Sequence, residues 1–404
     1  MYEKDFPFDM VDLAYLLKLE VKHKTGASWN VNCPFCQDRK GKMNLNLKKK
    51  VFRCNRCGES GGMLDLYGKL YNVDYAAANE EIMEALGKGS EKSDYIVQKK
   101  ELDKKLPEVE QAETATVKER NRTYTMLLRF LPLAVSHEAN LLERGFSRRR
   151  IYANGYKSTP AYGFKKLAER LLKEGCRVEG IPGFYLDKDE RWTVNFSAKD
   201  AGFLVPVRNM DGLIEGMQIR LDHPYDGRKY IWFSSANRRM GVTSKSPVHF
   251  VGEEEQECVF VTEGPLKADL ANFLSGRTFA AVAGVNLYGN LPPVMKQLKQ
   301  QGTRLVYEAY DMDKLLKLIC QNDYKEEYCS ECKIREEGIG KAICPKKEIK
   351  RSNIQKGCKN LYRICKECGL ESKSLTWDTD EKGEWNGNIK GVDDYLFDLK
   401  GKKQ

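Results

Sequence analysis

Two pairs of closely spaced cysteines near the N-terminus constrain this chain more than any other feature. Each pair has the spacing CxxC, and 17 residues separate the second cysteine of the first pair from the first of the second. Two thiolates at this spacing can point at one tetrahedral zinc ion. Alternating apolar residues over 43–47, a basic turn and the run 51–53 predict a hairpin that brings the pairs together. The sequence therefore predicts a zinc ribbon with the ligands Cys33, Cys36, Cys54 and Cys57.

Length and charge restrict what the rest of the chain can be. A chain of 404 residues is too long for one ordinary core, so we expect several domains. The formal charge of +10 favours a polyanionic partner, and nucleic acid is the first candidate. No apolar run reaches about 18 residues and no apolar signal segment begins the chain, so we expect a cytoplasmic protein without a membrane partner. The 13 cysteines are then expected to be metal ligands or reduced thiols.

Composition and periodicity divide the chain into four segments. Residues 1–88 hold the zinc ribbon and short helices, and residues 89–123 have the charged, polar composition of a linker. Residues 124–248 mix helices with short strands, an α+β pattern. Residues 249–404 alternate strands and helices, which predicts a doubly wound parallel sheet. The expected fold class is therefore α/β, with a zinc ribbon, an α+β middle subdomain and a Cys-rich insertion at about 321–357 in the parallel-sheet domain.

Acidic side chains follow three segments of this expected sheet. Glu263 ends its first apolar strand, Asp311 and Asp313 follow the third, and Asp393 comes after a late strand expected at 374–377. Carboxylates gathered at one sheet edge repel each other unless cations neutralise them, so we expect Mg²⁺ or Mn²⁺. Ions held in this way can support the transfer of a phosphoryl or nucleotidyl group. Any one of these residues alone could instead cap a helix or form a turn.

The acidic motifs resemble the Toprim domain, which DnaG-type primases share with topoisomerases and some nucleases. The sequence FRCNRCGESGGMLDLY is similar to the zinc-binding domain of DnaG-type primases. The stretches LLERGFSRRRIYANGYKS and LVPVRNMDGLIEGMQIR, followed by KYIWFSS, resemble segments of the primase polymerase core. These likenesses occur in the expected order, so the chain resembles a DnaG-type primase, closest to the short primases of phages and mobile elements.

The resemblance implies a DNA primase that makes short primers on single-stranded DNA from nucleoside triphosphates, by metal-dependent nucleotidyl transfer during replication of a phage, plasmid or other mobile element. It implies a structural zinc ion and catalytic Mg²⁺ or Mn²⁺, in the cytoplasm of a bacterial cell or phage-infected host. The motif GxxxxGK[ST] is absent from the sequence, so a replicative helicase is expected in trans. The implied catalytic residues are Glu263, Asp311, Asp313 and Asp393, of which the first three would ligate the ion, and the implied substrate-binding residues are Arg220, Lys229, Ser234 and Lys267.

The chain departs from the primase pattern in three places. Gly391 stands where the last acidic motif commonly has an aspartate, so the geometry of a second ion is in question. Lys314-Leu315-Leu316 follows the central acids in place of small residues. The insertion at about 321–357 is the third departure, and its cysteines, with the one that follows it, could hold a second zinc ion or an iron–sulfur cluster. That candidate set is Cys329, Cys332, Cys344 and Cys358.

Other readings stay open at this stage. Cys365 and Cys368 also form a CxxC pair, but we interpret them as buried helix residues because free cysteine often packs in cores. A Toprim nuclease would use the same acids and metal to cut a phosphodiester. A degenerate primase that only binds single-stranded nucleic acid is the other alternative, and the departure at Gly391 keeps it open.

Overall fold

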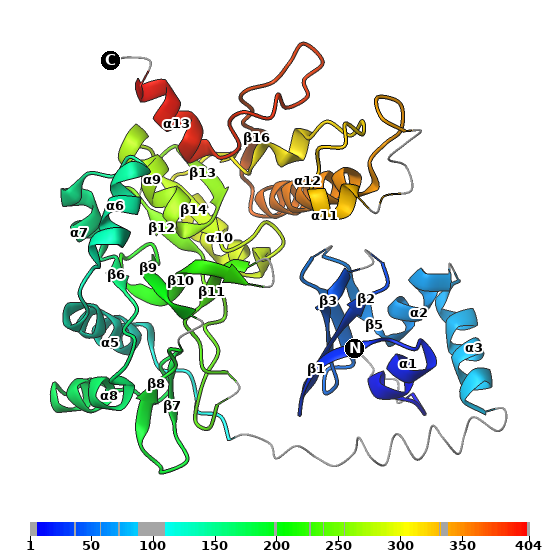
Figure 1. The fold of residues 1–404 in the computed structure, drawn as a ribbon, viewed down its shortest axis with the longest axis horizontal. Helices are drawn as coiled ribbons and strands as arrows, with labels where there is room; N and C mark the ends of the chain where they lie inside the picture. Colours follow the sequence, from blue (N-terminus) through cyan, green and yellow to red (C-terminus); the bar gives the residue numbers. More distant parts are fainter. Residues whose placement is uncertain are drawn as a thin grey trace. The chain divides into compact units, whose positions relative to one another are not determined.

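The structure is a computed structural model, and it describes residues 6–35, 38–56, 58–71, 73–87, 110–197, 200–225, 228–236, 238–253, 255–330, 332 and 338–401. The chain divides into two compact units, Met1–Glu108 and Val109–Gln404 (Figure 1). The predicted zinc ligands Cys36 and Cys57 lie outside the described residues. Within the described part of the chain, no helix has the length and apolar character needed to cross a membrane.

The described residues of the first unit form an antiparallel sheet and three helices. Its strands follow one another in chain order, and the expected hairpin is confirmed by the pairing of β3 with β4, in which Met43 lies opposite Cys54. The inward residues Val31, Leu45 and Phe52 are almost fully buried, so alternate positions of the strands form the core. The elements are α1 (Met10–Leu16), β1 (Val21–Thr25), β2 (Ser28–Cys33), β3 (Asp38–Asn46), β4 (Val51–Cys54), β5 (Ser60–Gly62), α2 (Met63–Tyr71) and α3 (Tyr75–Gly87).

The second unit begins with an α+β region. Its four-stranded antiparallel sheet has the order β11-β10-β9-β6, and β7 and β8 form a separate hairpin. The elements are α5 (Val117–Phe130), α6 (Val135–Glu143), α7 (Arg148–Asn154), β6 (Lys157–Ser158), α8 (Phe164–Lys173), β7 (Phe184–Leu186), β8 (Trp192–Val194), β9 (Gly202–Arg208), β10 (Ile214–Tyr225) and β11 (Arg228–Trp232).

One boundary differs from the sequence prediction. The expected linker extends to residue 123, whereas α5 begins at Val117. A reciprocal capping box explains the early start, because the Thr116 side chain accepts from the Glu119 backbone N–H while the Glu119 carboxylate accepts from the Thr116 backbone N–H. Thr123 and Tyr124 are fully buried, so this helix packs into the second unit.

The remainder of the second unit is the predicted parallel sheet. Its order is β12-β14-β13-β15-β16, in which β14, β13, β15 and β16 pair in parallel and β12 is an antiparallel edge strand that the sequence analysis did not anticipate. The fold class is confirmed as mixed α/β. The elements are β12 (His249–Val251), β13 (Cys258–Glu263), α9 (Pro265–Ser275), β14 (Phe279–Val282), η2 (Tyr288–Asn290), α10 (Leu291–Gln300), β15 (Leu305–Glu308), η3 (Met312–Leu315), α11 (Glu326–Cys329), α12 (Pro345–Glu367), β16 (Glu371–Ser374) and α13 (Val392–Gly401).

Two predictions about the end of this region were wrong. The last strand was expected at 374–377, but β16 covers Glu371–Ser374, and Trp377 beyond it packs into the hydrophobic core. The insertion was expected to end near 357, which lies in the middle of α12. Because α12 joins the parallel strands β15 and β16, its residues belong to the crossover that parallel pairing requires. The inserted material therefore ends before Pro345.

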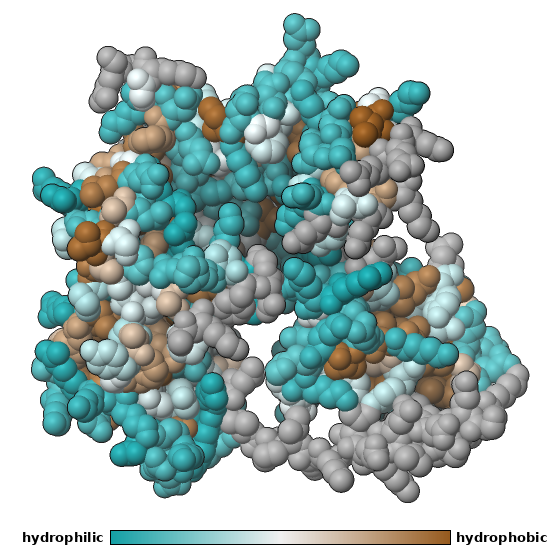
Figure 2. Space-filling view, viewed as in Figure 1, coloured by the Kyte–Doolittle hydropathy of each residue, from teal (hydrophilic) through white to brown (hydrophobic). Residues whose placement is uncertain are grey.

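Hydrophobic side chains cluster on both sides of the parallel sheet. On one side, α10 and α12 contribute residues such as Leu298 and Leu361 to a shared core with β13 and β15. Another cluster joins α9 and α13 with Trp377 and Trp385. Figure 2 shows that the visible face is mostly hydrophilic, with hydrophobic side chains in small scattered groups. The sheet is thus covered on both faces, and its carboxyl edge carries the site.

Candidate active site

The predicted acids lie on three segments of the chain that meet at the carboxyl edge of the parallel sheet. Glu263 is the last residue of β13, and Asp311 and Asp313 follow β15, its parallel neighbour. Pairing continues past β15, because the Ala309 N–H donates to the Val261 carbonyl at 2.8 Å. The loop before α13 joins them through the Met312 N–H, which donates to the Lys390 carbonyl at 3.0 Å. This bond brings the Asp393 segment to the same edge.

Gly264 allows the chain to turn directly after Glu263. Its φ of 90° lies in the region that side chains disfavour, and α9 begins at the next residue with a proline. The Gly264 N–H donates to the Val282 carbonyl of β14 at 2.7 Å. The turn therefore fixes the Glu263 backbone between two parallel strands.

Lysine side chains form ion pairs with both carboxylates of the central acidic pair, Asp311 and Asp313. Lys350 Nζ, from α12, lies 2.8 Å from Asp313 Oδ1. Lys390 Nζ lies 2.6 Å from Asp313 Oδ2 and 3.4 Å from Asp311 Oδ2. Lys267, on the first turns of α9, pairs with Asp311 Oδ1. Each of the four carboxylate oxygens of the pair therefore has an ammonium partner.

Burial and charge shift the protonation of these groups. Burial acts to lower the pKa of Lys267, but Asp311, Asp393 and Glu263 outweigh it and raise the pKa above its ordinary value. Burial acts to raise the pKa of Asp313, and the ammonium groups of Lys390 and Lys350 reverse this and lower it. Asp313 is thus held ionised by its lysines.

Glu263 is held differently from the central pair. Within the described residues, no hydrogen bond or ion pair is recorded for its carboxylate. Burial, together with the charge of Asp311, raises the pKa of Glu263 above its usual range. A carboxylate in this state accepts a proton more readily than an ordinary one.

Asp393 is the most constrained acid of the site. It is only 4% exposed, and its Oδ1 atom is buried without a hydrogen-bond partner. Burial raises its pKa to about 6, although the charge of Lys267 opposes the shift. A side chain at position 391 would collide with it, because a Cβ on Gly391 would lie 2.3 Å from Asp393 Oδ1. Asp394 is exposed and its Oδ2 accepts from the Gly391 N–H at 3.4 Å, so it does not replace the missing carboxylate.

The donor set does not fit a pair of divalent ions in this arrangement. In the described part of the chain, no three Asp, Glu, His or Cys side chains are arranged to hold a metal ion. The reason at this edge is chemical, because the oxygens of Asp311 and Asp313 already contact lysines. The orphaned Oδ1 of Asp393 is the oxygen that would be a donor to a single ion.

The four residues that the resemblance implies bind the substrate do not share one environment. Lys267 lies within the acidic cluster, where it pairs with Asp311. Arg220 on β10 lies over the Phe203 ring, 5.6 Å from its centroid, and Lys229 on β11 is exposed. The Ser234 carbonyl accepts from the Asn195 side-chain amide at 2.6 Å. Among the described residues, no hydrogen bond or ion pair joins Arg220, Lys229 or Ser234 to the acids.

The described half of the zinc ribbon has the chemistry of a thiolate knuckle. Cys33 and Cys54 are buried at the ends of β2 and β4. The Arg56 N–H donates to Cys54 Sγ at 3.3 Å, and the Gly58 N–H donates to the Cys54 carbonyl at 2.9 Å. An N–H that points at a sulfur stabilises a thiolate, the form that binds zinc. These residues fit a structural zinc ion.

The second set of cysteines does not form a site. Cys358 lies in the core between α12 and the parallel sheet, where burial and the charge of Glu308 raise its pKa to about 12. A thiol in such surroundings is a poor zinc ligand. In the part of the chain that the structure describes, Cys358 does not group with Cys329, Cys332 and Cys344 into a set that could hold a metal ion. Cys365 is fully buried and Cys368 packs against the same core, which confirms that they are packed helix residues.

Two lysines of the site, Lys350 and Lys390, were not predicted from the sequence. Lys350 lies 37 residues from its partner Asp313 and belongs to a basic run on α12, where a solvated face is the ordinary interpretation. Lys390 lies directly before the last acidic motif. A lysine adjoining an acidic motif is the one signal that could have indicated it.

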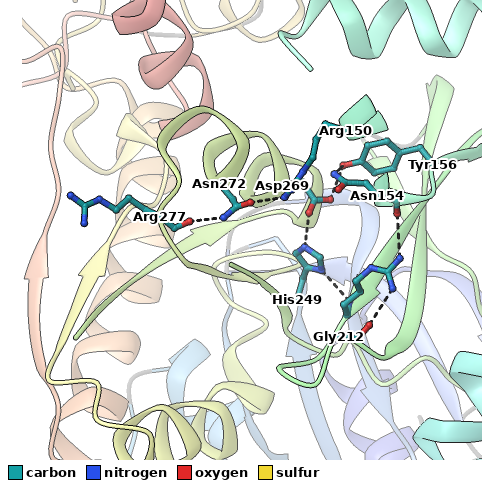
Figure 3. A network of polar contacts seen from close by, with 9 residues as sticks. Arg150, Asn154, Tyr156, Gly212, His249, Asp269, Asn272 and Arg277 are labelled. Atoms are coloured by element: carbon teal, nitrogen blue, oxygen red, sulfur yellow. Dashed lines mark hydrogen bonds and ion pairs between the residues drawn. The ribbon is translucent and has the colours of Figure 1, made fainter. Parts of the chain in front are cut away.

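A buried polar network beside the site was also missed (Figure 3). The Tyr156 hydroxyl donates to Asp269 Oδ2 at 2.7 Å, and His249 Nε2 lies 3.1 Å from Asp269 Oδ1. The Arg208 backbone N–H donates to His249 Nδ1 at 3.0 Å, so the other ring nitrogen, Nε2, faces Asp269. The network joins α9 and β12 to the middle region, and it lines a pocket of about 220 Å³ with Arg150 and Asn154.

The comparisons with known proteins first concern the N-terminal unit. Residues 8–97 match the CHC2 zinc finger family. The described geometry of Cys33 and Cys54 agrees with this match. The chain thus has an N-terminal CHC2 zinc ribbon followed by a unit that contains a parallel sheet.

Solved primase structures resemble the chain at low identity. The zinc-binding and RNA polymerase domains of the Aquifex aeolicus primase match at 16% identity, over 98% of this chain and 81% of that one, with a TM-score of 0.45. The RNA polymerase domain of Mycobacterium tuberculosis primase DnaG in complex with double-stranded DNA matches at 16% identity, over 47% and 63% of the two chains, with a TM-score of 0.38. A DnaG primase catalytic domain bound to ssDNA matches at 17% identity, over 48% and 64%, with a TM-score of 0.32. No curated protein matches the sequence.

Proposed function

We propose that the protein is a DNA primase that synthesises short oligonucleotide primers on single-stranded DNA. The observation that carries the proposal is the convergence of Glu263, Asp311, Asp313 and Asp393 at the carboxyl edge of a parallel sheet. The CHC2 zinc ribbon in the same chain supports it, because a nuclease needs no such module for cutting. The formal charge of +10 suits a polyanionic template.

The proposed reaction is nucleotidyl transfer. The 3′-hydroxyl oxygen of one nucleotide forms a bond to the α-phosphorus of a nucleoside triphosphate, and the bond from that phosphorus to the oxygen bridging to the β-phosphate breaks. Pyrophosphate leaves with the electron pair, and the hydroxyl proton passes to Glu263, whose raised pKa suits a proton acceptor. Lys267 and Lys390 place positive charge where the phosphates would lie. Asp393 would hold Mg²⁺ or Mn²⁺, which would supply further charge neutralisation beside the phosphates.

The parts of the chain receive the following roles. Residues 1–88 form the zinc-binding domain that holds the template or the first nucleotide, and residues 89–123 join it to the polymerase core. Residues 124–248 form the subdomain along which single-stranded DNA passes, with Arg220, Lys229 and Ser234 as contacts. Residues 249–404 form a Toprim domain. A replicative helicase would act in trans, in the cytoplasm of a bacterial cell or infected host, during replication of a phage, plasmid or other mobile element.

A primer-synthesis assay tests this proposal. The full chain is incubated with single-stranded DNA, the four ribonucleoside triphosphates with one labelled at the α-phosphate, and Mg²⁺ or Mn²⁺. We expect labelled oligonucleotides of a few residues from the wild type and none from Glu263→Ala. A parallel reaction with deoxyribonucleotides identifies the product as RNA or DNA.

The other outcomes would each support a different function. Shortening of an end-labelled template, lost in Glu263→Ala, would identify a nuclease. Binding of the template without either product would identify a catalytically degenerate binding protein. Either result would contradict the primase proposal.

A further inference from the structure

The oxygens of the central acidic pair are shared among ammonium groups from separate elements. Lys267 comes from α9, Lys350 from α12 and Lys390 from the loop before α13. Of these, only Lys390 contacts both acids, with Nζ at 2.6 Å from Asp313 Oδ2 and 3.4 Å from Asp311 Oδ2. It therefore lies where a cation bridging two carboxylates would lie.

The burial of Asp313 makes this arrangement stable. Asp313 is 1% exposed, so its carboxylate would be poorly solvated without Lys350 and Lys390. A divalent ion that approaches Asp313 must displace an ammonium group that the site already stabilises.

The charges of the whole cluster lead to the same conclusion. Four carboxylates and three ammonium groups leave a formal charge of −1. One divalent ion changes this to +1, whereas two would produce +3 in a partly buried site. The unpartnered Oδ1 of Asp393 provides a donor for the single ion.

We propose that the Lys390 ammonium group is a built-in cation that bridges Asp311 and Asp313 in place of one divalent ion, so that the acidic cluster takes one divalent ion and not two. The inference rests on the proposed function only in that it concerns the same cluster. A nucleotide substrate would then meet one metal ion and a fixed lysine, and Lys390 would be a further residue that contacts the phosphates.

Counting bound Mn²⁺ tests the inference without any assay of synthesis. The full-length, zinc-loaded chain is titrated with Mn²⁺, and the free ion is measured by electron paramagnetic resonance. We expect no more than one Mn²⁺ per wild-type chain, and one additional Mn²⁺ in Lys390→Gln, because this variant opens the bridging position. Lys390→Arg keeps the charge and should bind as the wild type does.

Two other variants test whether the number of bound Mn²⁺ ions depends on the bridging position of Lys390 or on the loss of any nearby positive charge. Lys382→Gln removes a positive charge from an exposed position of the same loop and should leave the count unchanged. Lys350→Gln removes the other partner of Asp313, while Lys390 still bridges Asp311 and Asp313. The number of Mn²⁺ ions bound by this variant should therefore also stay at the wild-type value. Two Mn²⁺ ions in the wild type, or equal counts in wild type and Lys390→Gln, would overturn the inference. The wild-type count decides even if a variant fails to fold, and a nuclease outcome in the primer assay would leave this result valid.

Discussion

The Nζ atom of Lys390 lies 2.6 Å from Oδ2 of Asp313, a carboxylate that is almost completely buried. This contact ties the loop before α13 to the turn that follows β15. Two segments of the parallel-sheet region, at positions 313 and 390 and so 77 residues apart, thus share one electrostatic cluster. The contribution of this cluster to folding can be tested by unfolding experiments, and its part in the proposed reaction by activity measurements.

Asp393→Asn should stabilise the protein at alkaline pH. Burial raises the pKa of Asp393 to about 6 from 3.8. As the pH rises, Asp393 therefore loses its proton at a higher pH in the folded state than in the unfolded state. The wild type therefore loses stability as the pH rises from about 4 through about 6, by about 3 kcal/mol for a shift of about two units. In urea unfolding without divalent ions, Asp393→Asn should have a higher free energy of unfolding than the wild type at pH 8. At pH 5 this difference should be smaller.

Glu381→Gln is the matched control for that experiment, because Glu381 is exposed in the preceding loop. It should unfold as the wild type does at both pH values. A destabilised Asp393→Asn at pH 8 would mean that the carboxylate is well paired, contrary to the structure.

Gly391→Ala should lower both stability and activity. The added Cβ would lie 2.3 Å from Asp393 Oδ1, so the carboxylate or the loop must move. Overpacking of this kind costs about 1–3 kcal/mol. Gly289→Ala is the matched control, since its Cβ meets nothing within 4 Å. Equal urea midpoints for the two variants would show that the last acidic motif tolerates a side chain at 391.

Lys314→Met should destabilise the second unit strongly. Lys314 Nζ lies 2.8 Å from Oε1 of Glu308, which is fully buried and also accepts from the Tyr362 and Ser374 hydroxyls. Removal of one partner from a buried ion pair costs about 3–5 kcal/mol. The double variant Glu308→Gln with Lys314→Met should recover part of this loss. A loss below about 1 kcal/mol for Lys314→Met in urea unfolding would contradict the buried pair.

The full chain should bind one zinc ion. Cys54→Ser removes a ligand of the CHC2 zinc ribbon and should abolish zinc binding, as measured by mass spectrometry of the metal content. Cys358→Ser alters a core thiol and should keep the full zinc content. Two zinc ions in the wild type, or loss of zinc in Cys358→Ser, would reinstate a cysteine site in the insertion.

Much of this architecture follows from local patterns. The hairpin of the zinc ribbon, the parallel strands and the acids Glu263, Asp311 and Asp313 at strand ends could all be predicted, because strand period and turn residues depend on near neighbours. The end of the insertion could not, because α12 has an amphipathic pattern that serves equally for an inserted helix or for a crossover helix.

The lysines of the site illustrate the remaining difficulty. Lys267 and Lys350 lie on helices whose exposed faces also carry lysine, and only the packing of α9 and α12 on the sheet aims these two at the acids. The buried bond between Tyr156 and Asp269 likewise joins residues 113 positions apart. Such pairings depend on tertiary packing that single-sequence patterns do not encode.

The most direct measurement is the formation of the first phosphodiester bond on a single-stranded template by the wild type, Glu263→Gln and the surface control Glu371→Gln. We predict labelled dinucleotide from the wild type and from Glu371→Gln, and a loss of at least a hundredfold in Glu263→Gln, in line with the removal of a proton acceptor. Dinucleotide formation by Glu263→Gln at the wild-type rate would contradict the assignment of this sheet edge as the site of synthesis.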